Sequence, residues 1–236
     1  MNQPLAYVHP GAKIAKNVVI EPFTTIHNNV KIGEGTWIGS NVTIMEGARI
    51  GKNCNIFPVS IYDDAVIGNH VTIHSGSVLG ANAFYYKNRP DGYDRLKSCG
   101  RVVIEDHVDI GAACTIDRGV TGDTRIKAGA KIDNQVQIGH DTVIGRKCLI
   151  ASQAGIAGCT IIEDEVIIWG QVGITSGVTI GEKAIISAKA GVSKSLEGGK
   201  SYFGIPADDF RSKYKEIAAI RKIPEILEKL KQSDKK

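Results

Sequence analysis

A branched aliphatic residue returns at every sixth position along most of this chain. The spacing holds from Val8 to Ile56, restarts twice, and then runs unbroken from Ile126 to Val192. Two positions before each of these rungs stands Ala, Val, Thr, Cys or Ser. No helix has a period of six, whereas a strand of period two that is interrupted by a turn every six residues does.

Hexapeptide repeats of this kind are typical of parallel β-helices. The rung and its small partner both point inward. Many rungs are followed directly by glycine, which suits a corner where the backbone must adopt an unusual conformation. Three sides close a coil of about 18 residues, so residue i+18 stacks on residue i. The sequence therefore predicts an all-β fold, with the β-helix over residues 1–195 and a C-terminal loop and helix over residues 196–236.

The C-terminal region carries a helical pattern from about residue 208 to residue 231. Asp208 or Asp209 is the expected N-cap, and Pro224 is expected to kink the helix or divide it in two. The polar face of this helix is basic. It is interpreted either as the solvated face of a helix that packs on the end of the prism, or as a surface for an acidic partner.

Composition excludes several classes of protein. The chain has 27 glycines and 6% aromatic residues. It has no run of 18 apolar residues, so no membrane span is expected, and its N-terminus lacks a signal-peptide pattern. Cys54, Cys114 and Cys148 fall in the inward column, which predicts buried thiols rather than disulfides or metal ligands and favours the cytoplasm. A net charge of +4 does not demand a nucleic-acid partner.

The breaks in the ladder are the places to look for chemistry, since insertions in a solenoid often form the binding face. The ladder slips once between Ile56 and Ile67. The largest insertion spans residues 80–101 and contains three tyrosines together with turn-forming Asn, Pro, Asp and Gly. Tyrosines are scarce in disordered loops, which favours a functional loop. A short charged insertion follows at residues 117–123.

One histidine among six occupies a distinctive position. His140 lies two residues after a rung, and residue 158, one coil further, is Gly158. A histidine can act as a general base, and a bare backbone N–H beside it can receive a developing oxyanion. This layout suits acyl transfer, although a surface histidine at a turn would show the same spacing.

Four strings occur in one order along the chain: TIDRG at 115–119, KIDNQVQIGH at 131–140, GQVGI at 170–174 and GIPA at 204–207. With the long loop and the terminal RKIPEILEKLK segment, they make the chain resemble the UDP-3-O-acylglucosamine N-acyltransferases of lipid A biosynthesis. The resemblance implies a left-handed parallel β-helix, a cytoplasmic homotrimer with active sites between prisms, and no cofactor. The acyl donor would be carried on the phosphopantetheine of acyl carrier protein, and the acceptor would be a UDP-sugar lipid precursor.

The resemblance also implies roles for individual residues. His140 would be the general base and the Gly158 amide the oxyanion donor. Asp133 and Gln137 would lie near the pantetheine arm, and the adjacent Asn134 is included in the predicted substrate-binding set.

Two features depart from this family's pattern. The family carries a uridine-binding domain ahead of the solenoid, whereas this chain begins almost at the first rung, like a short form. Gly177 also stands where the family has a second histidine. The IGHD string is similar to the pathway's O-acyltransferase, which contains a His–Asp pair, so the acceptor stays open.

Three other functions are compatible with parts of the sequence. A nucleotide-sugar acetyltransferase that uses acetyl-CoA would share the prism and a corner histidine. A zinc hydratase would need three converging histidines, and His70, His74 and His107 do not share a corner phase with His140. A catalytically lapsed paralogue could act as a binding scaffold.

Overall fold

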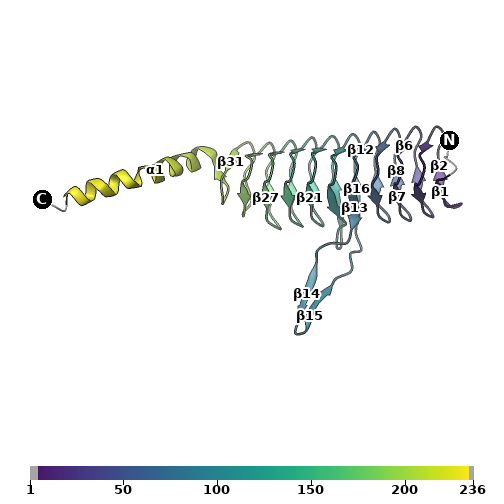
Figure 1. Cartoon of the computed structure of the whole chain (residues 1–236), viewed down its shortest axis with the longest axis horizontal. Coiled ribbons are helices and arrows are strands. Elements are labelled where there is room, and N and C mark those ends of the chain that lie inside the picture. The colour runs from purple at the N-terminus through teal and green to yellow at the C-terminus, as the bar shows by residue number, and fades with distance from the viewer. Residues whose placement is uncertain (1–4, 234–236) are drawn as a thin grey trace.

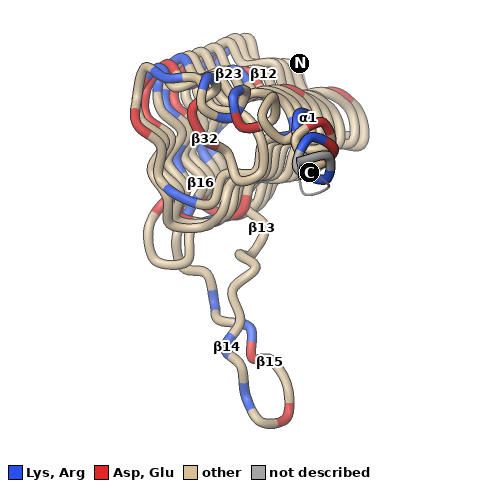
Figure 2. Tube along the Cα trace, turned by 90° about the vertical axis from the view of Figure 1, so that its left-hand side faces the viewer, with Lys and Arg blue, Asp and Glu red and all other residues tan. Residues whose placement is uncertain are grey.

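The chain forms a three-sided prism of stacked coils, seen from the side in Figure 1 and end-on in Figure 2. This computed structural model describes residues 5–233, so the outermost ends of both predicted regions, residues 1–4 and 234–236, lie outside the described residues. Three sheets of ten, nine and eleven strands make the sides. The fold is a left-handed parallel β-helix, as the family resemblance implied.

The strands follow one another around the prism, and most are two residues long. The first sheet contains β1 (Tyr7–Val8), β4 (Thr25–Ile26), β7 (Thr43–Ile44), β10 (Ser60–Ile61), β13 (Val78–Ala81), β18 (Thr115–Asp117), β21 (Gln137–Ile138), β24 (Gly155–Ile156), β27 (Gly173–Ile174) and β30 (Gly191–Val192). The second contains β2 (Lys13–Ile14), β5 (Lys31–Ile32), β8 (Arg49–Ile50), β11 (Val66–Ile67), β16 (Arg101–Ile104), β19 (Asp123–Ile126), β22 (Val143–Ile144), β25 (Ile161–Ile162) and β28 (Thr179–Ile180). The third contains β3 (Val19–Ile20), β6 (Trp37–Ile38), β9 (Asn55–Ile56), β12 (Thr72–Ile73), β17 (Asp109–Ile110), β20 (Lys131–Ile132), β23 (Leu149–Ile150), β26 (Ile167–Ile168), β29 (Ile185–Ile186), β31 (Ser201–Phe203) and the antiparallel β32 (Asp208–Asp209).

The rungs form the core of the prism, which confirms the inward direction of the ladder. Ile26 and Ile44 pair in register and are fully buried, as are most of the others. The small residues two positions before the rungs also form hydrogen bonds where they are polar. The Thr24 hydroxyl donates to Gly39 O at 2.7 Å, and the Cys148 thiol donates to Glu163 O at 3.0 Å. These side chains therefore satisfy corner carbonyls of the next coil.

The predicted burial of three cysteines is confirmed. Cys54, Cys114 and Cys148 are buried and unpaired, and burial raises the pKa of Cys148 to about 11. Their thiols are thus inert parts of the core at neutral pH.

The corner positions that need a left-handed backbone conformation are not the glycines directly after the rungs, where the sequence pattern placed them. The left-handed backbone occurs three residues after a rung, for example at Asn29 and Gln153. Glycines directly after rungs serve close approach instead, because a Cβ on Gly33 would lie 2.6 Å from the backbone of Gly51 in the next coil.

The ladder contains more rungs than the strict six-residue spacing identified. Ile61 is a fully buried rung reached after only five residues, so the slip after Ile56 is one shortened repeat. The coil also continues past Val192, where Leu196 bridges to Ile180 and Tyr202 pairs with Ile186 in the third sheet.

A single helix, α1 (Phe210–Ser233), follows the coils. Asp209 caps it as expected, because its Oδ1 accepts the N–H groups of Arg211 and Ser212 at 3.1 Å. The expected division at Pro224 is wrong, since the helix continues through it. Proline removes one backbone hydrogen bond, but its fixed φ is compatible with the helix.

The packing expected for this helix also differs from the structure. The helix projects along the prism axis rather than packing against its end, and its apolar residues are exposed, among them Ile220, Ile223 and Leu227. Within residues 5–233, no helix is long and apolar enough to cross a membrane.

The large insertion forms a hairpin of β14 (Tyr86–Arg89) and β15 (Gly92–Arg95) that stands out from the prism (Figures 1 and 2). Its base is tied to the 117–123 insertion. The Arg118 guanidinium donates to Gly100 O and pairs with Asp63, both at 2.8 Å, and the Arg118 N–H donates to Ala81 O at 2.9 Å. Both insertions therefore meet at one edge of the prism, between the first and second sheets.

Candidate active site

His140 lies at this same edge, in the turn between β21 and β22. The chain leaves the core at Ile138, and Gly139 lets the next coil approach, because a Cβ there would lie 2.5 Å from Gly158 N. Asp141 then adopts the left-handed conformation, with φ of 56°. The corner geometry thus turns His140 outward, although its side chain is only 14% exposed.

His140 is paired with its chain neighbour. Its Nδ1 lies 2.8 Å from Asp141 Oδ2. When the proton on Nδ1 is donated to this carboxylate, the lone pair is on Nε2, which is then the proton acceptor. The sequence showed the adjacent acid, and the structure shows that its oxygen meets the imidazole.

The carboxylate of Asp141 is itself held by backbone groups of the 117–123 insertion. Val120 N and Gly122 N each donate to it at 2.9 Å. Burial raises the pKa of Asp141, but hydrogen bonds from Val120, His140, Gly122 and Thr121 outweigh burial, so its pKa is lowered. Asp141 therefore stays ionised near neutral pH and can orient and stabilise a protonated imidazole.

Gly158 lies directly opposite the imidazole. A Cβ at Gly158 would lie 2.6 Å from Nε2 of His140, so a larger residue would force the ring to move. At other corners a side-chain oxygen accepts the equivalent N–H, as Asp164 does for Arg146 at 2.8 Å. Within the described residues, no group accepts the Gly158 N–H. The structure thus brings together the two residues that the 18-residue spacing paired.

These two residues line a cleft of about 610 Å³. Gln137 lies in it, with its Nε2 donating to Asp117 Oδ2 at 3.2 Å. Burial raises the pKa of Asp117 against the opposing effects of Gln137, His140 and Arg95. The remaining lining residues come from the first sheet, from the corners that follow its strands and from the hairpin base: Asn82, Phe84, Gly139, Ile156, Ala157 and Ser176.

Asp117, Asn82, Phe84 and Ser176 were not predicted as site residues. Asp117 could have been found by counting the insertion, because β18 pairs with β21 at a separation of 22 residues rather than 18. Ser176 Oγ donates to Gly158 O at 2.7 Å, and Gly177, the position of the missing second histidine, is a left-handed corner with φ of 72°.

The structure does not bring Asp133 and Asn134 to His140 within one chain. They lie at the corner between the third and first sheets, at the other end of β21. Asp133 Oδ2 accepts Ser152 N at 3.2 Å, and Asn134 Oδ1 accepts Ala112 N at 2.8 Å. Within the protomer, both side chains stabilise a corner.

No metal was predicted here, but three side chains at the His140 corner could offer ligands to one. His140, Asp141 and Cys159 place one possible ligand atom each within 4.8 Å of one another, the one such group in residues 5–233. The carboxylate is already committed to backbone donors and to Nδ1. The other histidines do not join it: His70 stacks on His107 with ring centroids 4.8 Å apart, and His74 stacks on Phe57.

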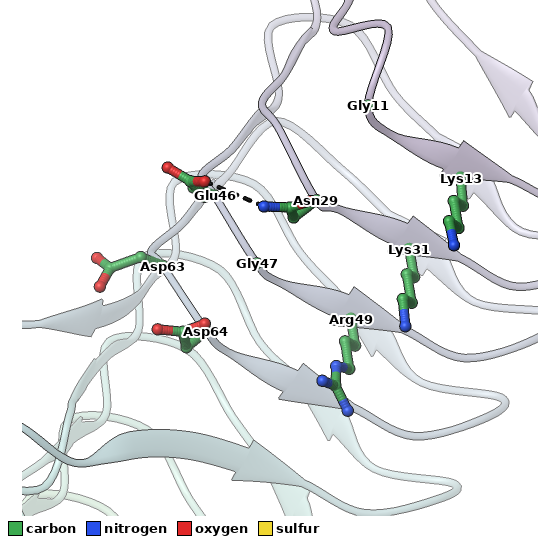
Figure 3. A pocket seen from close by; sticks show the side chains of 9 residues that line it. All are labelled: Gly11, Lys13, Asn29, Lys31, Glu46, Gly47, Arg49, Asp63 and Asp64. Carbon is green, nitrogen blue, oxygen red and sulfur yellow. Dashed lines mark hydrogen bonds between the residues drawn. The ribbon is translucent and has the colours of Figure 1, made fainter.

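A larger cavity of about 740 Å³ lies at the N-terminal end of the same edge (Figure 3). Lys13, Lys31 and Arg49 form a column on one side, and acidic residues lie at the corners on the other. It contains no histidine or cysteine, so it offers no group suited to deprotonate an amine at neutral pH. We therefore assign the candidate chemistry to the His140 cleft.

Comparison with known proteins agrees with this architecture. Residues 2–88 match the GMPPB C-terminal domain, residues 123–158 the bacterial transferase hexapeptide (six repeats), and residues 159–192 the hexapeptide repeat of succinyl-transferase. The UDP-N-acetylglucosamine acyltransferase of Bacteroides fragilis superposes with a TM-score of 0.68 and 30% identity, covering 89% of this chain and 73% of that one. The chain belongs to the hexapeptide-repeat acyltransferase family.

Within this acyltransferase family, the sequence is similar to UDP-3-O-acylglucosamine N-acyltransferases, which confirms the resemblance seen in its motifs. The protein of Wolinella succinogenes is 42% identical over 71% of this chain and 54% of its own length. That of Sinorhizobium fredii is 58% identical over 66% of this chain and 44% of its own length. The chain thus spans about half the length of these relatives.

Proposed function

We propose that this protein is an N-acyltransferase that moves a 3-hydroxyacyl chain from acyl carrier protein to the amine of a UDP-activated acylated glucosamine. The observation that carries the proposal is the His140–Asp141 pair set opposite the free N–H of Gly158. Relatives named for this activity support the choice of acceptor.

His140, Asp141 and the Gly158 N–H can account for every bond and proton in the acyl transfer. The acceptor nitrogen attacks the thioester carbon and forms a C–N bond, while Nε2 of His140 takes a proton from the nitrogen. The N–H of Gly158 donates to the oxyanion of the tetrahedral intermediate. Collapse breaks the C–S bond, and the imidazolium returns its proton to the departing thiolate. Asp141 stabilises the imidazolium between these steps.

A smooth track leads from the cleft along the first sheet, where an acyl chain or a pantetheine arm could lie. The outward positions of β24, β27 and β30 are Gly155, Gly173 and Gly191, which pair in consecutive register. A Cβ at Gly155 or Gly173 would meet nothing within 4 Å, so the track is open. A Cβ at Gly191 would lie 3.4 Å from the side chain of Ile205, so the track is narrower there.

A homotrimer is part of the proposal. The exposed apolar residues of α1 need a partner surface, and three such helices projecting along one axis could cover one another. In that arrangement, Asp133 and Asn134 of one subunit would reach the cleft of the next and could hold the pantetheine arm. Light scattering should give about three times the 25.3 kDa chain mass; a monomer at micromolar concentration would rule out the shared site.

Acyl carrier protein is the proposed donor, with its own phosphopantetheine as the only prosthetic group required. We expect the reaction to take place in the cytoplasm, where the buried unpaired thiols would be stable.

The deciding experiment incubates the protein with hydroxyacyl-carrier protein and the UDP-activated 3-O-acylglucosamine, and detects the N-acylated product by mass spectrometry. A parallel reaction with acetyl-CoA separates the acetyltransferase alternative. The proposal requires that His140→Ala abolish product formation while the circular dichroism spectrum is unchanged. If neither donor is consumed by the wild-type protein, a binding scaffold is the better description.

A further inference from the structure

The hairpin has two chemically different faces. Residues that pair directly across β14 and β15 share a face, and alternate residues face opposite ways. Tyr86 pairs with Arg95 and Asn88 with Tyr93, so these four share one face. The other face is charged: Lys87 is paired across the strands with Asp94, which forms an ion pair with Arg89 at 2.8 Å.

The aromatic face encloses a cavity of about 510 Å³ lined by Phe84, Tyr85, Tyr86, Asn88 and Tyr93. The Phe84 and Tyr86 rings meet edge-on with centroids 5.1 Å apart. Phe84 is 83% exposed and Tyr93 is 74% exposed, so both ring surfaces are available. Aromatic walls with one amide group suit a flat ring with polar edges.

This aromatic cavity adjoins the catalytic cleft. Phe84 lines both. Tyr85, which lines the aromatic cavity, also contacts the imidazole of His140, with ring centroids 5.6 Å apart. A ligand could therefore occupy both spaces at once, with one end stacked on the hairpin and the other beside Nε2.

One cation, Arg95, is near a wall of each space, because it contacts Tyr86 of the aromatic cavity and its charge acts on Asp117 of the cleft. The Arg95 guanidinium stacks over the Tyr86 ring at 4.9 Å from its centroid and donates to the Tyr86 hydroxyl. Its charge lowers the pKa of Asp117 in the cleft, against a larger effect of burial. No carboxylate in residues 5–233 forms an ion pair with Arg95. Its charge is thus available to an anion that bridges the cavity and the cleft.

We propose that the hairpin binds the nucleotide of the acceptor: the base stacks in the aromatic cavity, the diphosphate meets Arg95, and the sugar amine reaches His140. This inference rests on the proposed function for the identity of the acceptor. It assigns a nucleotide subsite to the hairpin, of which the catalytic cleft uses only the base as a wall.

Isothermal titration of the full chain with UDP and with uridine tests the subsite without any acyl transfer. Phe84→Ala and Tyr93→Ala should each weaken both ligands on the order of tenfold through lost stacking. Arg95→Ala should weaken UDP by a similar factor and leave uridine almost unchanged. The matched control is Lys87→Ala on the opposite face, which should leave both affinities within twofold of the wild type.

The outcomes separate this inference from the proposed function. His140→Ala should still bind UDP, because the base subsite does not include the imidazole. UDP affinity that is unaffected by Phe84→Ala and Tyr93→Ala would overturn the subsite even if acyl transfer is found. If the same variants instead lower the oligomeric mass, the aromatic face is an interface between copies and the inference is wrong. Conversely, hairpin-dependent UDP binding without acyl transfer would uphold the subsite and reject the activity.

Discussion

Asparagine at position 141 would keep the shape of Asp141 and remove its charge, which tests the pairing with His140 directly. When Nε2 takes the proton, the imidazolium lies 2.8 Å from the carboxylate through Nδ1. Coulomb's law with an effective dielectric constant of 20 gives about 6 kcal/mol at that distance. A neutral amide would keep a hydrogen bond of about 1 kcal/mol.

Water lowers the electrostatic value, because the side chains of His140 and Asp141 are 14% and 19% exposed. We therefore expect Asp141→Asn to cost about 3 kcal/mol of transition-state stabilisation, or roughly a 10²-fold fall in kcat. The KM for the acceptor should change little, because the carboxylate faces the imidazole and the backbone of residues 120–122 rather than the substrate.

Stability supplies a second readout with a defined pH dependence. The pKa of Asp141 is lowered in the fold, so the unfolded chain binds this proton more tightly. The stabilisation from the carboxylate is therefore complete above its unfolded pKa of about 3.8 and is lost as the pH falls through the lower folded pKa. The contribution of the Asp141 carboxylate to the difference in free energy of unfolding between wild type and Asp141→Asn should therefore shrink as the pH falls below about 4.

Asp106→Asn is the matched control. Asp106 also accepts a backbone N–H, that of Asn69 at 2.7 Å, and its pKa is lowered mainly by that bond. It follows Ile104 at another corner and does not line the His140 cleft. Both variants should lose stability, and only Asp141→Asn should lose kcat. A kcat within threefold of the wild type in folded Asp141→Asn would refute the assigned role.

Three further changes have expected outcomes. Gly158→Ala should displace the His140 ring, which would lie 2.6 Å from the new Cβ, and lower kcat on the order of 10²-fold without unfolding the coil; stopped-time product assays measure it. Arg118→Ala should cost about 1–3 kcal/mol in chemical denaturation, because Gly100 O and the Asp63 carboxylate lose their buried donor. Reversing the charges of Arg211, Lys215 and Arg221 should raise KM for the carrier-bound donor, in a salt-dependent manner, but not for a small pantetheine donor; an equal loss with both donors would make α1 purely structural.

The ladder predicted most of the fold because a period of six leaves few alternatives. It missed Ile61 and Tyr202 for two different reasons. Ile61 follows a repeat that is one residue short, and Tyr202 is an aromatic residue in a position that had always been aliphatic. The exposure of the apolar face of α1 could not be predicted from the sequence either, because the helical pattern shows which face is apolar but not what covers it.

Site residues could be predicted only where the period survives. Gly158 follows His140 by one coil, and the structure places the two residues against each other. Asp133 and Asn134 are closer to His140 in sequence, yet they belong to the preceding corner of the prism, because six residues already turn the chain by one side. Their substrate-binding role, which the family resemblance implied, therefore stays a prediction.

Three of the four residues that sequence reasoning missed share a cause, because Asn82, Phe84 and Asp117 belong to the two insertions, whereas Ser176 lies one regular coil beyond Gly158. Leu79 and Ile104 are separated by the hairpin insertion, and Ile116 and Ile126 by the shorter one, and both insertions leave the first sheet for the second. The two insertions stack on one edge of the prism. Because of the shorter one, β18 pairs with β21 at a separation of 22 residues, which brings Asp117 beside Gly139. The same stacking places the backbone N–H groups of Val120 and Gly122 on Asp141. An uninterrupted ladder repeats one environment in every coil, so a catalytic corner differs from the others only where inserted residues reach it.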